Sequence, residues 1–334
     1  MRGSDTGGGV WRLPLTHESL LEVMIAQGKA ARPRLTVSPA FLARRRLVDR
    51  TMRVVLFVCA ALSVLVTAGI VYVLLSESVK FFAQVSIIDF LTDTQWTPVF
   101  QDKHFGIMTL VSGTLVSSLI ALLVAIPAGT VLAIYLSEFA QPQVRETIKP
   151  FLELIAGVPT VAFGYFALLF LTPIFQVFIP GLAGFNLLVP GIVMGIMILP
   201  YIVSVSEDAM RAVPDTLREG AFALGFTRLQ TATRVVIPGA FSGVTAAYIL
   251  GMSRAVGETM VVAIAAGQQA KLALNPLEGA ATITAYIVQI SLGDVPHGSI
   301  AYLTIFAAGM TLFLMTFAFN ILAFWLRQKY REVY

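Results

Sequence analysis

Long uncharged runs alternate with short charged segments along this chain. Residues 54–75 contain no charged side chain over 22 positions, and residues 106–137 contain none over 32. At a rise of about 1.5 Å per residue, a helix of about 20 residues crosses the roughly 30 Å hydrocarbon core of a bilayer. Both runs are therefore predicted to be membrane-spanning helices, the second kinked at Pro127.

Four further spans follow from the remaining runs. Residues 154–206 are uncharged over 53 positions, which is too long for one helix, and turn residues between Pro180 and Pro190 divide them. The expected fold class is all-α: a polytopic membrane protein with six transmembrane helices, in which an N-terminal segment 1–50 precedes a transmembrane domain 51–330. The six predicted spans cover about residues 54–75, 106–137, 154–178, 188–206, 239–267 and 300–326.

The placement of Lys and Arg predicts the orientation of these spans, because short basic segments resist export. Ten of the 23 basic residues precede residue 54. Nine more lie in segments 138–149 and 207–238 and in the tail from Arg327, all on the same predicted side. The opposite loops hold only three. Both termini are therefore expected in the cytoplasm.

Composition argues against several other classes of protein. Hydrophobic residues make up 57% of the 334 positions and charged residues only 13%, about half the charged fraction of soluble domains. The net charge of +4 is spread around the apolar runs rather than gathered with aromatic residues, so nucleic-acid binding is not expected. The single cysteine, Cys59, cannot form a disulfide within the chain or a multi-cysteine metal site.

The chain also lacks the patterns of a soluble enzyme. Gly28-Lys29 has neither the upstream glycine nor the following Ser or Thr of a phosphate-binding loop. The three histidines are too scattered along the sequence to hold a metal ion from one helix. We therefore expect no catalytic residue, no metal site and no cofactor in this chain.

Two extramembrane segments carry patterns without an assigned role. The external loop 76–105 contains Trp96 and several Phe residues, typical of an interfacial segment or of a docking surface. Thr16 to Lys29 has apolar residues at helical spacing after a possible capping box, which predicts one short amphipathic helix.

The segment 207–238 is the most patterned polar part of the chain and predicts a helix, a turn and a second helix. Pro214 with Asp215 favours the start of a short helix, Gly225 permits a sharp turn, and the second helix ends at Pro238. Three apolar side chains of the unit are expected to pack: Leu217, Phe222 and Leu224.

This segment resembles the coupling loop of the permease subunits of ATP-binding-cassette importers. That loop carries Glu-Ala-Ala, three residues, Gly, nine residues and Ile-x-Leu-Pro, and this chain has Glu219-Gly220-Ala221, Gly225 and Val235-Val236-Ile237-Pro238 at the same spacing. The resemblance implies a type I importer permease fold and a loop that sits in a groove of an ATPase subunit. A loop that merely joins two spans is the alternative. The implied coupling residues are Arg218, Glu219, Gly220, Ala221, Leu224 and Gly225.

The second constellation is Ser253 to Thr259, which places Arg254 and Glu258 four residues apart and therefore on one face of a continuous helix. A charge at the centre of a spanning helix costs about 2.5–3.5 kcal/mol on insertion scales, so the two charges should pair or line a wet path. A structural ion pair is one interpretation. The other is oxyanion passage, in which the planar guanidinium of Arg254 binds the anion, Glu258 orients it, and Ser253 and Thr259 donate hydroxyls.

Arg254 to Thr259 also resembles the Arg-Ala-x-Gly-Glu-Thr run of phosphate-specific importers, whose membrane subunits occur in pairs. The similarity extends over about residues 50–330, and the loop with Trp96 is more like that of the PstC subunits. It implies an inorganic phosphate permease of the bacterial inner membrane, with Arg254 on the substrate path. Gly157, Pro159 and Gly164 would allow a helix break or close helix packing, and a break would bring Thr160 and Tyr165 to the path.

The resemblance further implies partners. These are a second permease subunit of the PstA type, an ATPase dimer of the PstB type that binds ATP and Mg, an external phosphate-binding protein of the PstS type, and membrane lipid. Three alternatives stay open: a permease for sulfate or molybdate, a proton-coupled secondary transporter that uses Glu258, and a membrane scaffold without transport.

Overall fold

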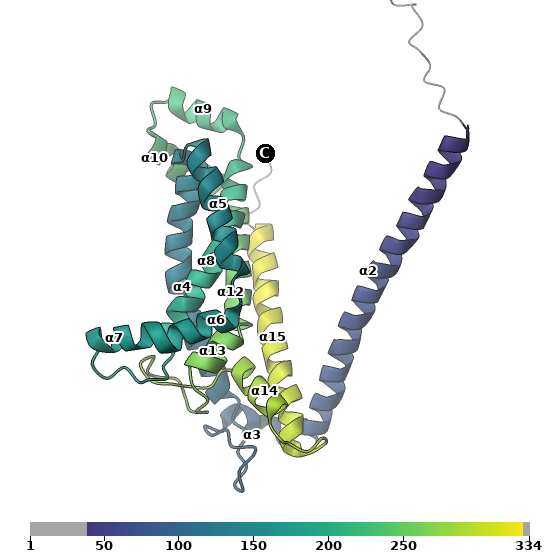
Figure 1. Cartoon of the computed structure of the whole chain (residues 1–334), viewed down its shortest axis with the longest axis vertical. Coiled ribbons are helices and arrows are strands. Elements are labelled where there is room, and N and C mark those ends of the chain that lie inside the picture. The colour runs from purple at the N-terminus through teal and green to yellow at the C-terminus, as the bar shows by residue number, and fades with distance from the viewer. Residues whose placement is uncertain (1–38, 330–334) are drawn as a thin grey trace, which may run out of the picture. The chain divides into compact units, whose positions relative to one another are not determined.

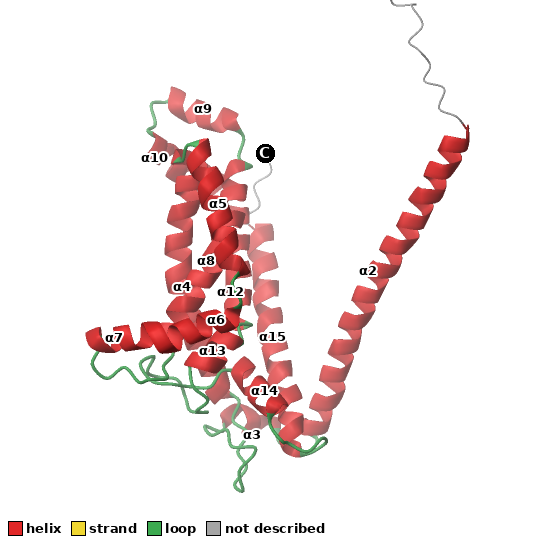
Figure 2. Cartoon of the chain, viewed as in Figure 1, coloured by secondary structure: helices red, strands yellow, loops and turns green. Residues whose placement is uncertain are grey.

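The computed structural model describes residues 39–329, and its regular elements are helices (Figure 2) apart from one isolated β-bridge between Trp96 and Phe105. The chain divides into two compact units, residues 1–68 and 69–334. The all-α fold class is confirmed. The amphipathic helix predicted within residues 16–29 lies outside the described residues.

The first long helix is α2 (Pro39–Phe82), which contains the first predicted span, 54–75, and extends beyond it at both ends. Within its segment Val48–Phe82, a stretch of 18 residues has a mean hydropathy of 2.8. The last turn of α2 belongs to the second unit, where the buried ring of Phe81 makes edge contacts with three aromatic neighbours. These are Phe82, Phe90 of the short helix α3 (Ile87–Thr92), and Phe105. The loop 76–105 is thereby packed by its own aromatic side chains.

The centre of the second unit is the pair formed by α4 (Met108–Ile134), which ends in the π-helical turn η1 (Tyr135–Phe139), and α8 (Leu188–Arg211). A Cβ atom on Gly195 would lie 2.8 Å from the backbone oxygen of Ala121. A side chain at this position would therefore push α8 away from α4. Small residues permit such close helix approach inside membranes.

The third predicted span, 154–178, is wrong as a single helix. Helix α5 (Pro142–Gly157) ends before Pro159, because a residue that precedes proline disfavours the helical region, and Val158 is extended (φ −66°, ψ 131°). A second helix then runs through α6 (Thr160–Tyr165), η2 (Phe166–Leu171) and α7 (Thr172–Phe178).

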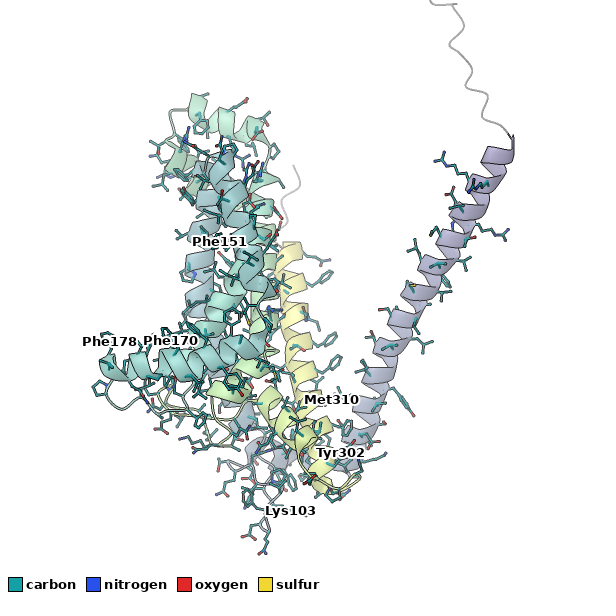
Figure 3. All side chains as sticks on the ribbon, viewed as in Figure 1. Lys103, Phe151, Phe170, Phe178, Tyr302 and Met310 are labelled. Atoms are coloured by element: carbon teal, nitrogen blue, oxygen red, sulfur yellow. The ribbon has the colours of Figure 1, made fainter. Side chains whose placement is uncertain are left out.

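This second helix has the length and composition of a span, yet it lies across α4 and α8 in Figure 1, whereas α5 runs along them. Figure 3 labels Phe170 and Phe178 on it, and both rings are exposed. The close approach predicted at Gly164 is confirmed, because a Cβ atom there would lie 3.2 Å from the backbone oxygen of Met260. The transverse helix is thus fixed to the bundle at its first turns.

The fifth predicted span, 239–267, is also interrupted. Helix α12 (Phe241–Val256) ends at Gly257, and the short helix α13 (Met260–Ala265) begins three residues later. Helix α12 packs against α8 and against α15 (Ile300–Lys329), the helix that contains the sixth predicted span, 300–326. Helix α14 (Ile283–Leu292) lies between α13 and α15 in the sequence.

By length and composition, five helices of the described chain are able to cross a membrane. The pair Arg228–Gly239 and Phe241–Val256, bent by 75°, makes up a sixth if it is one span. Helix α8 continues to Arg211, so the predicted coupling segment 207–238 begins inside a helix. After α8 come α9 (Asp215–Ala223), α10 (Arg228–Thr231), the π-helical turn η3 (Ala232–Val236) and α11 (Ile237–Gly239).

Candidate functional site

The coupling segment folds as the predicted helix, turn and helix. Gly225 has φ 84°, its N–H donates to the carbonyl of Phe222 (2.9 Å), and the N–H of Phe226 donates to the carbonyl of Ala221 (3.1 Å). This pair of bonds is the Schellman ending of a helix, which needs a left-handed residue and therefore favours glycine. Thr227 then begins α10 with a capping box.

Arg218 connects α9 to the rest of the bundle. Its Nη2 and Nε donate to the two carboxylate oxygens of Glu138 in η1, at 3.0 and 3.3 Å. Further bonds reach the carbonyls of Met210 (2.8 Å) and Val213 (2.5 Å) at the end of α8, and the carboxylate of Asp215 (3.1 Å). Arg218 therefore joins the ends of three helices, α4, α8 and α9, through a partly buried ion pair.

The apolar side chains of this unit do not pack as predicted. Leu217 and Phe222 are exposed, and Leu224 is 80% exposed at the tip of the turn, whereas the small Ala221 faces the bundle. The expectation that all three larger side chains pack within the chain is wrong. A short helix presents only one face to the bundle, and in α9 the side chains of Arg218 and Ala221 occupy that face.

Glu219 and Gly220 also lie on the exposed side of α9. No heavy atom lies within 4 Å of a Cβ built on Gly220, so alanine would fit there. The coupling residues named from the sequence thus divide into an inward pair and an outward set that includes Leu224.

Arg254 stacks on an aromatic ring near the middle of α8. Its guanidinium carbon lies 4.4 Å from the centroid of the Tyr201 ring, a cation–π contact. The Nε atom of Arg254 is buried and has no hydrogen-bond partner. Among residues 39–329, the guanidinium forms no ion pair, so its donors are available to a ligand.

Glu258 does not pair with Arg254, and the expectation that the two share one helix face is wrong. The helix ends between them, and the Oε1 atom of Glu258 accepts hydrogen bonds from the N–H groups of Met260 (3.1 Å) and Val261 (3.4 Å). The buried carboxylate thereby caps the start of α13, which explains the break, since a capping side chain competes with continuation of the helix. Thr284 of α14 donates to the backbone oxygen of Glu258 (2.7 Å).

The remaining predicted path residues occupy separate places. The buried hydroxyl of Ser253 has no hydrogen-bond partner and lines a cavity of about 250 Å³ with Asn320 of α15. Thr259 bonds locally, to the carbonyl of Gly257 (3.3 Å). Tyr165 lines a larger cavity of about 1030 Å³ beside the loop that follows α13, and Thr160 begins α6. The structure thus places Tyr165 in a different cavity from Ser253.

Two residues of these sites were missed by sequence reasoning. Tyr201 stands inside an uncharged run, and a lone tyrosine within a span was the available signal. Glu138 directly follows the second uncharged run, where it reads as an ordinary flanking charge. Neither position reveals a partner until the helices are packed.

Comparison with known proteins agrees with this geometry. Residues 125–332 match the family described as binding-protein-dependent transport system inner membrane component. This chain belongs to that family. It is therefore a transport subunit rather than an enzyme, and a multi-pass protein of the inner membrane.

Individual relatives resemble this permease over most of its length. A probable ABC transporter permease protein YqgH from Bacillus subtilis is 33% identical over 85% of this chain and 93% of that protein. A phosphate transport system permease protein PstC from Mesorhizobium japonicum is 34% identical over 68% of this chain and 74% of that protein. The permease is thus PstC-like in sequence.

A solved structure shows the fold independently. It is that of a bacterial ABC transporter involved in the import of the acidic polysaccharide alginate. The alignment covers 86% of this permease and 100% of that chain, with a TM-score of 0.60 and 15% identity. The type I importer permease fold expected from the coupling loop is thereby confirmed.

Proposed function

We propose that this permease forms the membrane path of an ATP-driven importer of inorganic phosphate. The observation that carries the proposal is Arg254, whose guanidinium rests on the Tyr201 ring with a buried Nε that has no acceptor. A tetrahedral oxyanion can place two of its oxygens in the plane of a guanidinium, where both accept hydrogen bonds from its N–H groups. The similarity to proteins named PstC supports phosphate as that oxyanion.

The proposal assigns a partner to each end of the bundle. The end that carries α9 and α10 faces the cytoplasm together with both termini, in line with the excess of Lys and Arg on that side. There the exposed Leu224 and its neighbours contact a PstB-like ATPase dimer, which holds ATP and Mg. A PstA-like permease completes the path, and a PstS-like protein delivers phosphate at the opposite end, near Tyr165.

Electrostatics require such coupling. Moving a charge against the membrane potential costs about 2.3 kcal/mol per 100 mV, and a phosphate dianion that enters a negative interior meets this cost twice. A passive pore would lose phosphate. An exposed apolar turn tied to the bundle through Arg218 gives an ATPase a place to act.

The test is uptake of radiolabelled phosphate by cells that depend on this permease. Arg254→Ala should lower uptake at least about tenfold, the effect of losing one charge-assisted hydrogen bond of about 1.5–3 kcal/mol. Arg254→Lys should retain part of the uptake, and Arg50→Gln, at an exposed arginine of α2 outside the coupling unit, should retain all of it. Normal uptake by Arg254→Ala, in complexes shown by co-purification to assemble, would refute the proposal.

Two further measurements separate the rival transporters. Stimulation of the ATPase by a sulfate-loaded binding protein, and not by a phosphate-loaded one, would assign the path to another oxyanion. Phosphate uptake into liposomes that contain the purified chain alone, driven by a pH gradient, would identify a proton-coupled secondary transporter that uses Glu258 instead.

A further inference from the structure

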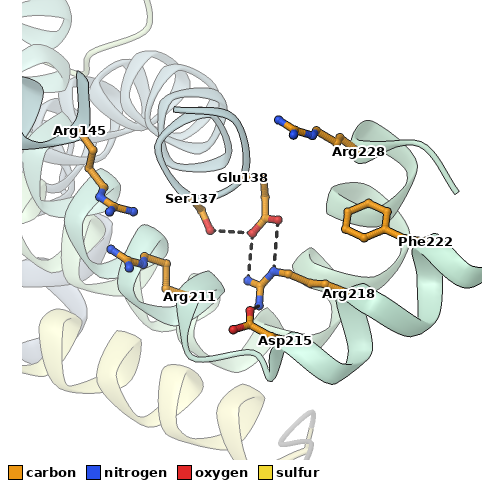
Figure 4. Close-up of a pocket in the computed structure, with 8 residues that line it drawn as sticks. All are labelled: Ser137, Glu138, Arg145, Arg211, Asp215, Arg218, Phe222 and Arg228. Carbon is orange, nitrogen blue, oxygen red and sulfur yellow. Dashed lines mark hydrogen bonds and ion pairs between the residues drawn. The ribbon is translucent and has the colours of Figure 1, made fainter. Parts of the chain in front are cut away.

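A cavity of about 410 Å³ lies between the coupling unit and the bundle (Figure 4). Its charged lining is dominated by arginine, and Arg218 binds both of the carboxylates. Figure 4 shows the guanidinium groups of Arg145 and Arg211 turned toward each other on one side of the cavity. The charged residues that line it are Arg145, Arg211, Arg218, Arg228, Glu138 and Asp215.

The packing of α5 against α8 places the first two of these arginines opposite each other. Lys149 of α5 contacts the buried carboxylate of Glu207 in α8. Further along α5, Ala156 lines the same cavity as Pro200, so residue numbers fall along α8 as they rise along α5. The two helices are therefore antiparallel. The two arginines lie one helical turn beyond the ion pair, four positions before Lys149 and four after Glu207, and hence on the same facing sides.

Neither guanidinium has a hydrogen-bonded carboxylate. The side chain of Arg145 forms no hydrogen bond or ion pair with residues 39–329. The Nη1 atom of Arg211 lies 3.6 Å from Oε1 of Glu207, and neither oxygen of that carboxylate has a hydrogen-bond partner. Glu207 also contacts Lys149, which lies 3.5 Å from Asp208. Three cations thus share two carboxylates at this end of α5 and α8.

Two positive side chains that face each other across a helix interface repel, and an anion between them removes the repulsion. Each guanidinium offers a planar fork of N–H donors, which matches the oxygens of a phosphate group. A phosphate group has enough oxygens to accept from two forks at once. Arg145 and Arg211 therefore present the donor set of a phosphate site.

We propose that Arg145 and Arg211 hold a phosphate group between the first turn of α5 and the end of α8. The group belongs either to free inorganic phosphate or to a lipid headgroup, and the experiment below separates these sources. Once bound, it fixes the spacing of two helices at the end where the coupling unit begins. That this end faces the cytoplasm rests on the orientation in the proposed function, whereas the binding itself does not.

Thermal unfolding of the full chain in nanodiscs measures the binding. The chain carries Arg254→Ala, so that the proposed transport path does not contribute. In phosphatidylcholine nanodiscs, inorganic phosphate should raise the unfolding midpoint in a saturable manner when the free ion is the ligand. When a lipid headgroup is the ligand, phosphatidylglycerol in the nanodisc should raise the midpoint and free phosphate should add nothing. Arg145→Gln and Arg211→Gln should each weaken the binding at least tenfold, which corresponds to about 1.4 kcal/mol.

Reversal of one charge gives a readout that nonspecific anion binding would not change. Because position 145 faces Arg211, the carboxylate of Arg145→Glu should take the place of the phosphate group and pair with Arg211. This variant should unfold at a higher temperature than Arg145→Gln in the absence of phosphate. Neither phosphate nor phosphatidylglycerol should then raise its midpoint further. Since Arg145 has no protein partner among residues 39–329, neither substitution leaves a buried group unpaired.

A matched control lies in the same cavity. Figure 4 shows Arg228 on the other side of the Glu138–Arg218 pair, so it does not reach a ligand held between the facing arginines. Arg228→Gln removes the same charge as Arg145→Gln. Because it acts only through screened, longer-range electrostatics, it should change the affinity less than about twofold.

Three results would overturn the proposal. They are an unfolding midpoint that neither phosphate nor phosphatidylglycerol raises, an effect of the ligand that persists in full in Arg145→Gln or falls as much in Arg228→Gln, and equal stability of Arg145→Glu and Arg145→Gln. The transport role is judged separately, by uptake in Arg254 variants with Arg145 and Arg211 intact. Failure of one proposal is therefore distinguishable from failure of the other.

Discussion

The guanidinium of Arg254 lies over the face of Tyr201, 4.4 Å from the ring centroid, on two neighbouring helices of the bundle. A carboxylate in the place of this ring would form a strong ion pair and leave fewer donors for a passing anion. The face of an aromatic ring attracts the cation without accepting its N–H groups in plane. Tyr201 thus stabilises the charge while Arg254 keeps its capacity to bind.

Replacing the ring tests this arrangement. Tyr201→Ala should lower phosphate uptake at subsaturating concentration by about two- to thirtyfold, since a cation–π contact contributes about 0.5–2 kcal/mol. Tyr201→Phe keeps the ring and should stay within about twofold of the parent. Initial rates of radiolabelled phosphate uptake provide the measurement. An equal loss in both variants would show that the hydroxyl, and not the ring face, is what matters.

Glu258 is expected to act through its cap on α13 rather than through its charge. Glu258→Gln keeps an oxygen that accepts from Met260 and Val261, so uptake should remain near the parent value. Glu258→Ala loses the cap, at a cost of about 1 kcal/mol, and should lower thermal stability in detergent. The pH profile of uptake provides the control. If Glu258→Gln abolishes a pH dependence present in the parent, the carboxylate takes part in proton movement and this assignment is wrong.

The ion pair between Arg218 and Glu138 should show strong energetic coupling. Each single change, Arg218→Met or Glu138→Leu, leaves a partly buried charge without its partner and should cost about 3 kcal/mol. The double variant should lose less than the sum of the two single changes. Thermal unfolding of the purified complex measures all three. Additive losses would show that the two groups do not stabilise each other.

Two glycines of the coupling unit should respond in opposite directions to alanine. Gly225→Ala places a side chain at φ 84° and should destabilise the end of α9 by about 1 kcal/mol. Gly220→Ala meets no neighbouring atom and should stabilise α9 by about 0.5–1 kcal/mol. Amide exchange of residues 215–226 should accelerate in the first variant and slow in the second. The same direction in both would contradict the turn geometry.

The loop 76–105 should lose stability in acid through Asp93. Partial burial raises the pKa of this carboxyl, but hydrogen bonds from the Gln95 N–H and from His104 (2.8 Å) lower it more, so the net pKa falls below 3.8. A carboxyl with a lowered native pKa stabilises the fold above its ordinary pKa, and this stability is lost as pH falls through the native value.

The fluorescence of Trp96, which is buried in the same loop, reports the change once Trp11 and Trp325 are replaced by Phe. We expect the emission of Trp96 to shift only below about pH 4. Asp93→Asn should remove this acid-dependent step. A step of the same size in Asp93→Asn would assign the transition to another group.

The sequence predicted best those helices whose ends coincide with charged residues that flank an apolar run. It allowed a break at Pro159 as an alternative to close packing, and the structure has that break. It missed the break at Gly257. The length of an apolar run indicates only how favourably the segment transfers into lipid. A broken helix inside a bundle transfers as favourably as a straight helix, so run length does not reveal the break. At the Gly257 break, the Glu258 carboxylate caps α13 and its backbone oxygen accepts a hydrogen bond from Thr284 of α14. The second contact joins residues 26 positions apart, so the local sequence does not show it.

The candidate site was predictable to a similar degree. Gly225 was identified because a left-handed residue at a helix end is favoured by the local sequence. Arg254 was identified because a charged side chain inside a membrane span is costly and therefore indicates a function. Tyr201 and Glu138 were not, since each gains its role from a partner more than 50 residues away along the chain. Arg218 determines which face of α9 contacts the bundle. Leu224 lies outside that face and therefore points outward, which the sequence alone does not show.

The hydrogen bonds of Arg218 connect the exposed turn at Leu224 to the long helices of the bundle. Since one guanidinium holds the ends of α4, α8 and α9, a displacement of the tip near Leu224 reaches two spans at the same time. Helices α4 and α8 contact each other at Gly191 and Gly195, where an added Cβ atom would lie only 2.8 Å from atoms of α4. On the proposed coupling, a displacement of the turn by an ATPase is therefore expected to move α4 and α8 together rather than bend one against the other.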